Sequence, residues 1–176
     1  EKGKLERYTH IGSGNYNAAS AKIYTDLGLF TANKDINDDV QDLFNVMTGY
    51  GVVNHYRKLL VSPHTLRPGI TKLIRREIEQ HKKHGNGHII IKCNQLVDYE
   101  MVKVLYEASR AGVKIECIVR GICSLRPGLP GVSDTITVRS IVGRLLEHAR
   151  IYYFHNNGDE EMYFGSADLV TRNLNG

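Results

Sequence analysis

Alternating strand and helix patterns between residues 59 and 119 constrain the fold of this chain most strongly. Short apolar runs typical of buried strands occur at 59–61, 88–93 and 113–119. An apolar stripe that begins near Pro68 and ends in basic residues predicts a helix between the first two runs. A second helix is predicted over 98–111, with Asp98 as its cap and Gly112 as its stop. This strand-helix-strand-helix-strand order predicts an α/β fold with parallel pairing.

The residues before this region predict a separate unit. Strands are expected over 5–11 and 23–30, and a helix over 35–47 with its apolar side chains on one face. The pattern breaks around 50–58, which predicts a domain boundary near residue 58.

The residues after 119 predict a long irregular loop and a final pair of strands. Prolines and glycines are frequent over 121–133, as in loops that carry function. Strands are predicted over 150–154 and 162–165, and Asn157-Gly158 between them indicates a hairpin.

Charge and cysteine content limit the class of protein. The 23 Lys and Arg residues exceed the 19 Asp and Glu residues by only four, too few to indicate a polyanion partner by themselves. No apolar run reaches the roughly eighteen residues that span a bilayer. The three cysteines lack Cys-x-x-Cys spacing, which argues against a disulfide framework or a zinc site. We therefore expect a cytoplasmic protein without a membrane span, and association with a membrane surface stays open.

Two glycine-serine turns carry the first candidate site residues. They are Gly12-Ser13-Gly14-Asn15 and Gly165-Ser166-Ala167-Asp168, and His148-Ala149-Arg150 precedes the second. On a strand, His148 and Arg150 would project from the same face about 7 Å apart, a spacing that suits two groups binding one phosphate. A buried histidine bonded to a backbone carbonyl is the alternative for His148.

Other residues gain their interest from their position. Ser13 and Asn15 lie in a glycine-rich turn that can approach an anion, although a plain turn has the same composition. Arg120 ends a predicted strand, where its guanidinium could clamp a phosphate or form a surface salt bridge. Asp168 could orient an imidazole or cap the segment that follows it. Tyr24 taken alone is an ordinary strand residue.

The two turns, one of them preceded by His-x-Arg, resemble the phospholipase D superfamily. Five segments are similar in order and spacing to the bacterial polyphosphate kinase family of that superfamily, namely 8–17, 59–63, 120–128, 139–148 and 165–173. The resemblance covers the whole chain and is far more specific than any single glycine motif.

The resemblance implies a mixed sheet flanked by helices, with residues 1–58 ending one phospholipase D-like catalytic domain. Residues 59–176 would form the second such domain, truncated at its C-terminus. In the family, residues matching Tyr24, Arg120 and His148 contact ATP, and His148 would face the transferred phosphate. Ser13, Asn15, Arg150 and Asp168 would bind or support phosphate.

The resemblance also implies an activity: reversible transfer of the terminal phosphate of ATP to inorganic polyphosphate through a phosphohistidine, with ADP as the other product. The nucleophilic histidine and the magnesium ligands would lie upstream of Glu1, so we assign no metal ligand here and expect the chain alone to be inactive. The full-length parent is expected to be a homo-oligomer. Two alternatives stay open, a phospholipase D-type phosphodiesterase and a non-catalytic module that binds polyanions.

Overall fold

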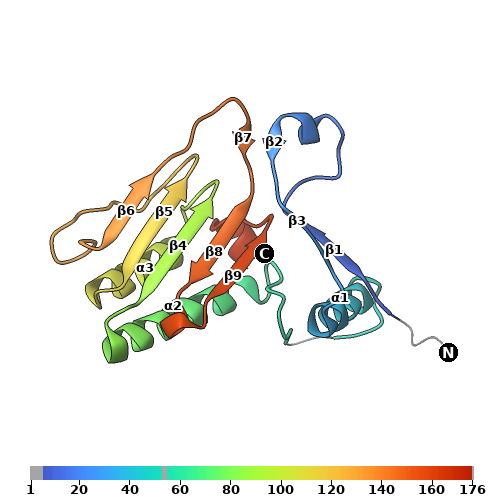
Figure 1. The fold of residues 1–176 in the computed structure, drawn as a ribbon, viewed down its shortest axis with the longest axis horizontal. Coiled ribbons are helices and arrows are strands. Elements are labelled where there is room, and N and C mark those ends of the chain that lie inside the picture. The colour runs from blue at the N-terminus through green and yellow to red at the C-terminus, as the bar shows by residue number, and fades with distance from the viewer. Residues whose placement is uncertain (1–5, 53–54, 176) are drawn as a thin grey trace.

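The computed structural model describes residues 6–52 and 55–175, and its strands form two small sheets and one larger sheet (Figure 1). The first small sheet pairs β1 (Thr9–Gly12) with β3 (Gly28–Thr31) in antiparallel orientation. The second pairs β2 (Tyr24–Thr25) in parallel with β7 (Leu146–Glu147), two segments far apart in the sequence. The second small sheet therefore joins the beginning of the chain to its C-terminal part.

The predicted strand over 23–30 is wrong as a single element. The chain leaves β2 at Asp26 and Leu27, and β3 then joins a different sheet. The main chain of Leu27 bonds to Ser13 instead of to a strand, accepting from the Ser13 amide at 2.9 Å and donating to the Ser13 hydroxyl at 2.9 Å. The predicted strand over 5–11 is observed as β1, and residue 5 lies outside the described residues.

Helix α1 (Lys34–Met47) confirms the helix predicted over 35–47. Asn33 caps its first turn by accepting from the Ile36 amide, and Gly49 follows its end with a positive φ of 79°. A short 3-10 turn, η1 (Ser20–Lys22), lies earlier in the chain.

The larger sheet has the strand order β6-β5-β4-β8-β9 and is mixed (Figure 1). Its parallel part consists of β4 (His88–Cys93), β5 (Lys114–Val119) and β6 (Ile136–Arg139). On the other side of β4, β8 (Arg150–Phe154) and β9 (Glu161–Gly165) are antiparallel. The predicted α/β class with a mixed sheet and flanking helices is confirmed.

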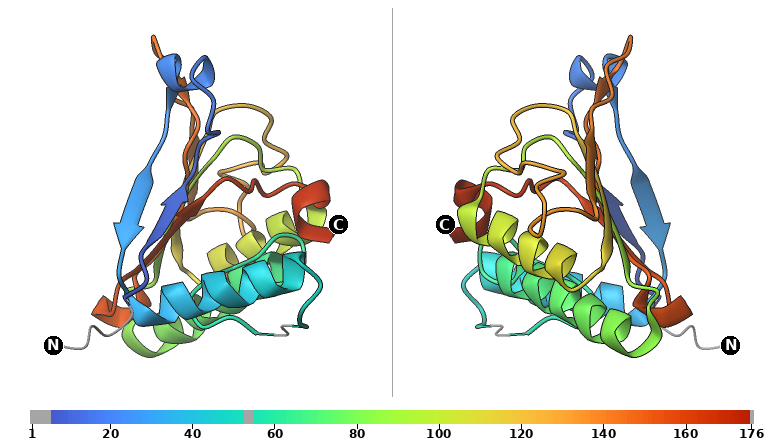
Figure 2. Two further views of the ribbon diagram at one scale, coloured as in Figure 1. Left: turned by 90° about the vertical axis from the view of Figure 1, so that its right-hand side faces the viewer. Right: turned by 90° about the vertical axis from the view of Figure 1, so that its left-hand side faces the viewer.

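Two long helices cover one face of this sheet (Figure 2). They are α2 (Leu66–His84), which ends at left-handed Gly85, and α3 (Tyr99–Arg110), which Asp98 caps through the Met101 amide. Both confirm predicted helices. Burial alternates along β4, so one set of its side chains meets the helices and the other stays partly accessible.

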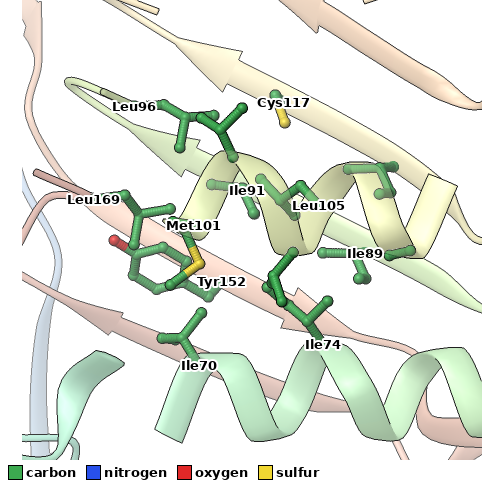
Figure 3. Packing of buried hydrophobic residues seen from close by; sticks show 14 of the residues in the cluster. Ile70, Ile74, Ile89, Ile91, Leu96, Met101, Leu105, Cys117, Tyr152 and Leu169 are labelled. Carbon is green, nitrogen blue, oxygen red and sulfur yellow. The ribbon is translucent and has the colours of Figure 1, made fainter. Parts of the chain in front are cut away.

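The core lies between the helices and the sheet (Figure 3). Helix α2 contributes Ile70 and Ile74, and both are fully buried. They pack in one cluster with residues of α3 and of the strands, among them Leu105, Ile89 and Tyr152. This core fixes the edge of the sheet from which the candidate site residues extend.

The predicted strand over 59–61 is wrong, since this segment joins no sheet. Its amides find side-chain acceptors instead: the fully buried carboxylate of Asp39 accepts from the amides of residues 57, 58 and 59 at 2.6–3.0 Å. The Val61 amide donates to the Thr65 hydroxyl at 2.7 Å. Leu60 packs against the core, which explains why the run is apolar.

The C-terminal part contains two strands that the sequence did not predict, β6 and β7. The irregular path over 121–133 is confirmed, as is the hairpin between β8 and β9. Its connection includes the 3-10 turn η2 (Asn156–Gly158), where three residues have positive φ. A short helix, α4 (Thr171–Asn175), follows β9.

Candidate functional site

His148 lies where the second small sheet meets the larger one, between the end of β7 and the start of β8. The expectation that it sits on a strand is wrong, because residues 148 and 149 interrupt the strand. The imidazole is only 13% exposed, and its Nδ1 lies 2.9 Å from Oδ1 of Asp26. The side-chain ring of Tyr24 lies beside it, with ring centroids 4.7 Å apart.

Asp26 connects the first glycine-serine turn to this imidazole. Its Oδ1 accepts from the Ser13 hydroxyl at 2.7 Å as well as from His148. Ser13 is completely buried and also accepts from the Leu27 amide. The predicted supporting residue Ser13 therefore reaches the site through Asp26, and its hydroxyl is not open to a ligand.

The first turn also borders a hollow of about 320 Å³. Tyr24, Asp26 and exposed Asn15 all line it, together with residues of β1 and β3. A Cβ at Gly14 would clash with the Asp26 carboxylate, so a larger residue here would have to displace that side chain. The turn thus brings its backbone directly against the carboxylate that holds His148.

Arg120 approaches the same strand break from the end of β5. Its Nη1 donates to the carbonyl of Glu147 at 3.0 Å, one residue before His148. It also lines a second hollow of about 430 Å³, whose walls include Ile23, Leu146 and a further arginine, Arg144. Tyr24, Arg120 and His148 therefore come together around one short segment.

Arg150 and Asp168 form a buried ion pair beneath that segment. Nη2 of Arg150 donates to Oδ2 of Asp168 at 2.9 Å, and its Nη1 donates to the carbonyl of His148 at 2.7 Å. Their side chains are 9% and 8% exposed. Asp168 also accepts from the backbone amides of Asn94 and Gln95. The prediction that Asp168 orients the imidazole is wrong, because the carboxylate that contacts His148 is that of Asp26.

The two glycine-serine turns both reach His148 through side-chain contacts. The first reaches its imidazole through Asp26, and the second reaches its carbonyl through Asp168 and Arg150. A carboxylate at Nδ1 orients the imidazole and favours the tautomer with the proton on that nitrogen.

The sequence interpretation missed Asp26, Lys92 and Asn94. Asp26 had a usable signal, because Tyr24 and Asp26 alternate along one extended segment and so lie on the same side of it. Lys92 and Asn94 had none, since they reach the segment from β4 and from the residue after it, more than fifty residues earlier.

Among residues 6–52 and 55–175, no three His, Cys, Asp or Glu side chains come together as a metal site. Over the same residues, no helix combines the length and apolar character needed to cross a membrane.

Comparison with known protein families identifies two adjoining matches. Residues 1–53 match polyphosphate kinase C-terminal domain 1, and residues 59–176 match polyphosphate kinase C-terminal domain 2. The second match alone covers more than half of the chain.

Individual relatives agree with these matches. The chain is 54% identical to polyphosphate kinase from Bacillus cereus over 98% of its own length and 24% of that protein. It is 56% identical to polyphosphate kinase from Prosthecochloris aestuarii, again over 24% of the relative. The chain thus spans about a quarter of the length of these relatives.

A solved structure shares the fold. The crystal structure of polyphosphate kinase from Porphyromonas gingivalis superposes with a TM-score of 0.91 at 42% identity, covering 99% of this chain and 27% of that one. Family matches, sequence relatives and architecture all lead to one assignment: the chain belongs to the polyphosphate kinase family.

Proposed function

We propose that this chain supplies the nucleotide-binding part of a polyphosphate kinase active site. The reaction is reversible transfer of the terminal phosphate of ATP to inorganic polyphosphate, carried out by the full-length protein. The observation that carries the proposal is the convergence of both glycine-serine turns on His148, with Tyr24 and Arg120 beside it. The polyphosphate kinase relatives favour this chemistry over the phosphodiesterase and polyanion-binding alternatives.

Tyr24, Arg120 and His148 would bind ATP and ADP. Arg120 uses Nη1 for the Glu147 carbonyl, so the rest of its fork would bind phosphate oxygens while its position stays fixed. The Tyr24 ring lies against the imidazole and would limit where the nucleotide can enter. Asn15, on the rim of the first hollow, would contact phosphate from the side of that hollow.

The transfer would proceed through a phosphohistidine in two steps. A nucleophilic histidine, which we place in the full-length protein outside this sequence, attacks the γ-phosphorus of ATP. The bond to the bridging oxygen breaks and its electron pair leaves with ADP. A terminal oxygen of polyphosphate then attacks the phosphorus, and the bond to the histidine nitrogen breaks. Two transfers between anions replace one more difficult transfer.

His148 would contact the phosphoryl group during both steps. Asp26 accepts from Nδ1, which leaves Nε2 to take a proton from a phosphate oxygen and, once it carries that proton, to donate to that oxygen. Arg120 would neutralise developing charge, the main contribution that a protein makes to phosphoryl transfer. Arg150 would act indirectly, by holding the His148 carbonyl through the hydrogen bond that it donates.

The setting of the reaction is also part of the proposal. The enzyme would act in the cytoplasm, where the reducing environment keeps cysteines as free thiols. Its free cysteines are Cys93, Cys117 and Cys123. Magnesium would assist the charged phosphates from ligands outside this sequence. The full-length enzyme would assemble as a homo-oligomer.

His148→Ala in the full-length enzyme tests the proposal. We expect loss of more than about a hundredfold in ATP-dependent polyphosphate synthesis, since a single acid–base group typically contributes that much. The melting temperature should change little because His148 lies outside the hydrophobic core. His84→Ala, at the exposed end of α2, is the matched control and should keep full activity. Unchanged synthesis by the His148 variant would refute the assignment.

A second test uses the chain by itself. Because the proposed nucleophile lies outside these residues, the 176-residue chain should give no polyphosphate elongation with ATP and magnesium. Elongation by the chain alone would show that a nucleophile is encoded within it.

A further inference from the structure

The carbonyls around His148 are held by cationic side chains instead of by a neighbouring strand. Arg120 donates to the carbonyl of Glu147 at 3.0 Å, and Arg150 donates to that of His148 at 2.7 Å. Lys92 donates to the carbonyl of Ala149 at 2.9 Å. Three consecutive carbonyls therefore each accept from a different positive charge.

The amides of the same segment face the other way. Those of His148 and Ala149 both donate to the carbonyl of Thr25 at 3.2 Å, and the Leu146 amide donates to that of Ile23. The segment is therefore bonded through its amides to β2 and the residue before it, and through its carbonyls to side chains of the larger sheet and its edge. Its conformation, and with it the direction of the imidazole, depends on both sets of bonds.

Lys92 stands where the backbone ladder between β4 and β8 ends. Its own backbone partner in that ladder is Ile151, and the segment before β8 has no partner strand on this side. Side chains bond to the backbone here instead of a strand. Lys92 donates to the Ala149 carbonyl. The side-chain amide of Asn94, oriented so that its oxygen accepts from Arg150, donates to the Glu147 carbonyl at 3.1 Å. Ala149 is buried, and a buried carbonyl without a partner would be costly, so the Lys92 contact stabilises the strand break.

The ammonium group of Lys92 is unusually enclosed for a lysine. Its side chain is 15% exposed, and its second contact is an ion pair with the carboxylate of Glu147 at 3.1 Å. Neither contact belongs to the hydrophobic core, because Lys92 points to the face of β4 opposite to Ile91 and Cys93. Its contacts are thus directed to the His148 segment.

We propose that Lys92 is a positioning residue for phosphoryl transfer: it holds the Ala149 carbonyl so that His148 stays aligned between Asp26 and the substrate. The proposal rests on the function proposed for His148. It assigns Lys92 no contact with ATP or polyphosphate, so its loss should slow turnover without weakening nucleotide binding.

Steady-state kinetics of full-length variants test this role. Lys92→Met deletes the ammonium but keeps the aliphatic stem, and should lower kcat about tenfold, as expected for one lost charge-assisted hydrogen bond. The KM for ATP should change less than about twofold, since uniform binding is retained. Lys92→Arg keeps a cationic donor and should recover at least a third of the kcat. Lys103→Met, on the exposed face of α3, is the matched control and should match the parent.

Glu147→Gln separates the two contacts of Lys92. It removes the ion pair and keeps the bond to the Ala149 carbonyl, so its loss of kcat should be smaller than that of Lys92→Met. Lys92→Arg, with its kcat and its KM for ATP, keeps the proposal testable if Lys92→Met does not fold. A loss as large as that of Lys92→Met, or a normal kcat in Lys92→Arg combined with a raised KM for ATP, would overturn the carbonyl-anchoring role.

The remaining outcomes are equally distinct. A normal kcat in Lys92→Met, or a raised KM for ATP at normal kcat, would overturn the proposal while leaving the role of His148 intact. Normal turnover in His148→Ala would instead overturn the proposed function itself.

Discussion

Asp26 offers the sharpest test of how the two parts of the chain cooperate. It lies at the end of β2, yet it holds an imidazole that the C-terminal part supplies. Both of its side-chain contacts, from Ser13 and from His148, use the same oxygen, Oδ1. Removing the carboxylate and neutralising it should therefore have different consequences.

Asp26→Asn can keep both hydrogen bonds, because an amide oxygen can occupy the position of Oδ1. It loses only the charge, and charge-assisted hydrogen bonds are roughly twice as strong as neutral ones. The expected cost is about 1 kcal/mol, or roughly a fivefold fall in kcat. Asp26→Ala removes both contacts and releases the imidazole, at a cost of about 1.5–3 kcal/mol, or roughly ten- to 150-fold in kcat.

The assay is ATP-dependent polyphosphate synthesis by the full-length variants, with melting temperatures measured in parallel. Asp26→Ala also leaves the buried Ser13 hydroxyl without its acceptor, so it should lower stability as well as kcat. Asp26→Asn should change kcat with little loss of stability. A kcat within twofold of the parent in Asp26→Ala would refute the reasoning, and so would equal losses in the two variants.

Four further predictions concern the site and the anchoring of residues 57–59 by α1. Gly14→Ala should displace the neighbouring Asp26 carboxylate and lower kcat about tenfold, whereas Gly51→Ala, whose Cβ would meet nothing closer than 3.9 Å, should be neutral in the same synthesis assay. Asp39→Asn leaves at least one of its three backbone donors without an acceptor and should lower the free energy of unfolding by about 1–3 kcal/mol in urea titrations. Burial opposes ionisation of Asp39, but the hydrogen bonds from the backbone amides outweigh burial and lower its pKa. The free energy of unfolding of the parent should therefore fall as the pH drops from about 4 through that lowered pKa. The same loss of stability at acid pH in Asp39→Asn as in the parent would contradict this. Arg120→Lys cannot bind phosphate bidentately and should raise the KM for ATP about tenfold, while Arg110→Lys, exposed at the end of α3, should leave it unchanged.

The sequence predicted elements that carry strong local signals. Helices α1, α2 and α3 have caps or glycine stops next to a clear apolar stripe, and these signals depend only on neighbouring residues. The hairpin between β8 and β9 was likewise marked by Asn157-Gly158. Local chemistry was sufficient in these cases.

Elements that depend on distant partners were missed or wrong. Strand β7 has two residues and exists because it pairs with β2, which lies more than a hundred residues earlier. The apolar run at 59–61 serves helix packing, and Asp39 and Thr65 satisfy its amides, so composition alone indicated a strand. No pattern within a short window distinguishes these cases.

The candidate site shows the same division. Tyr24 came from the family resemblance alone, whereas Arg120 and His148 were also indicated by their positions in the sequence, and the structure places all three around one segment. The role of Lys92 could not be predicted from the sequence, because its contact with the Ala149 carbonyl depends on where the ladder between β4 and β8 ends. The sequence therefore identified the groups around His148 more readily than the contacts that hold it in place.

A structure of the full-length enzyme with a non-hydrolysable ATP analogue tests the central claim most directly. Our account predicts that the terminal phosphate lies within hydrogen-bonding distance of Nε2 of His148 and of the Arg120 guanidinium, while Asp26 keeps its bond to Nδ1. A nucleotide bound elsewhere, with His148 and Arg120 free of its phosphates, would contradict it.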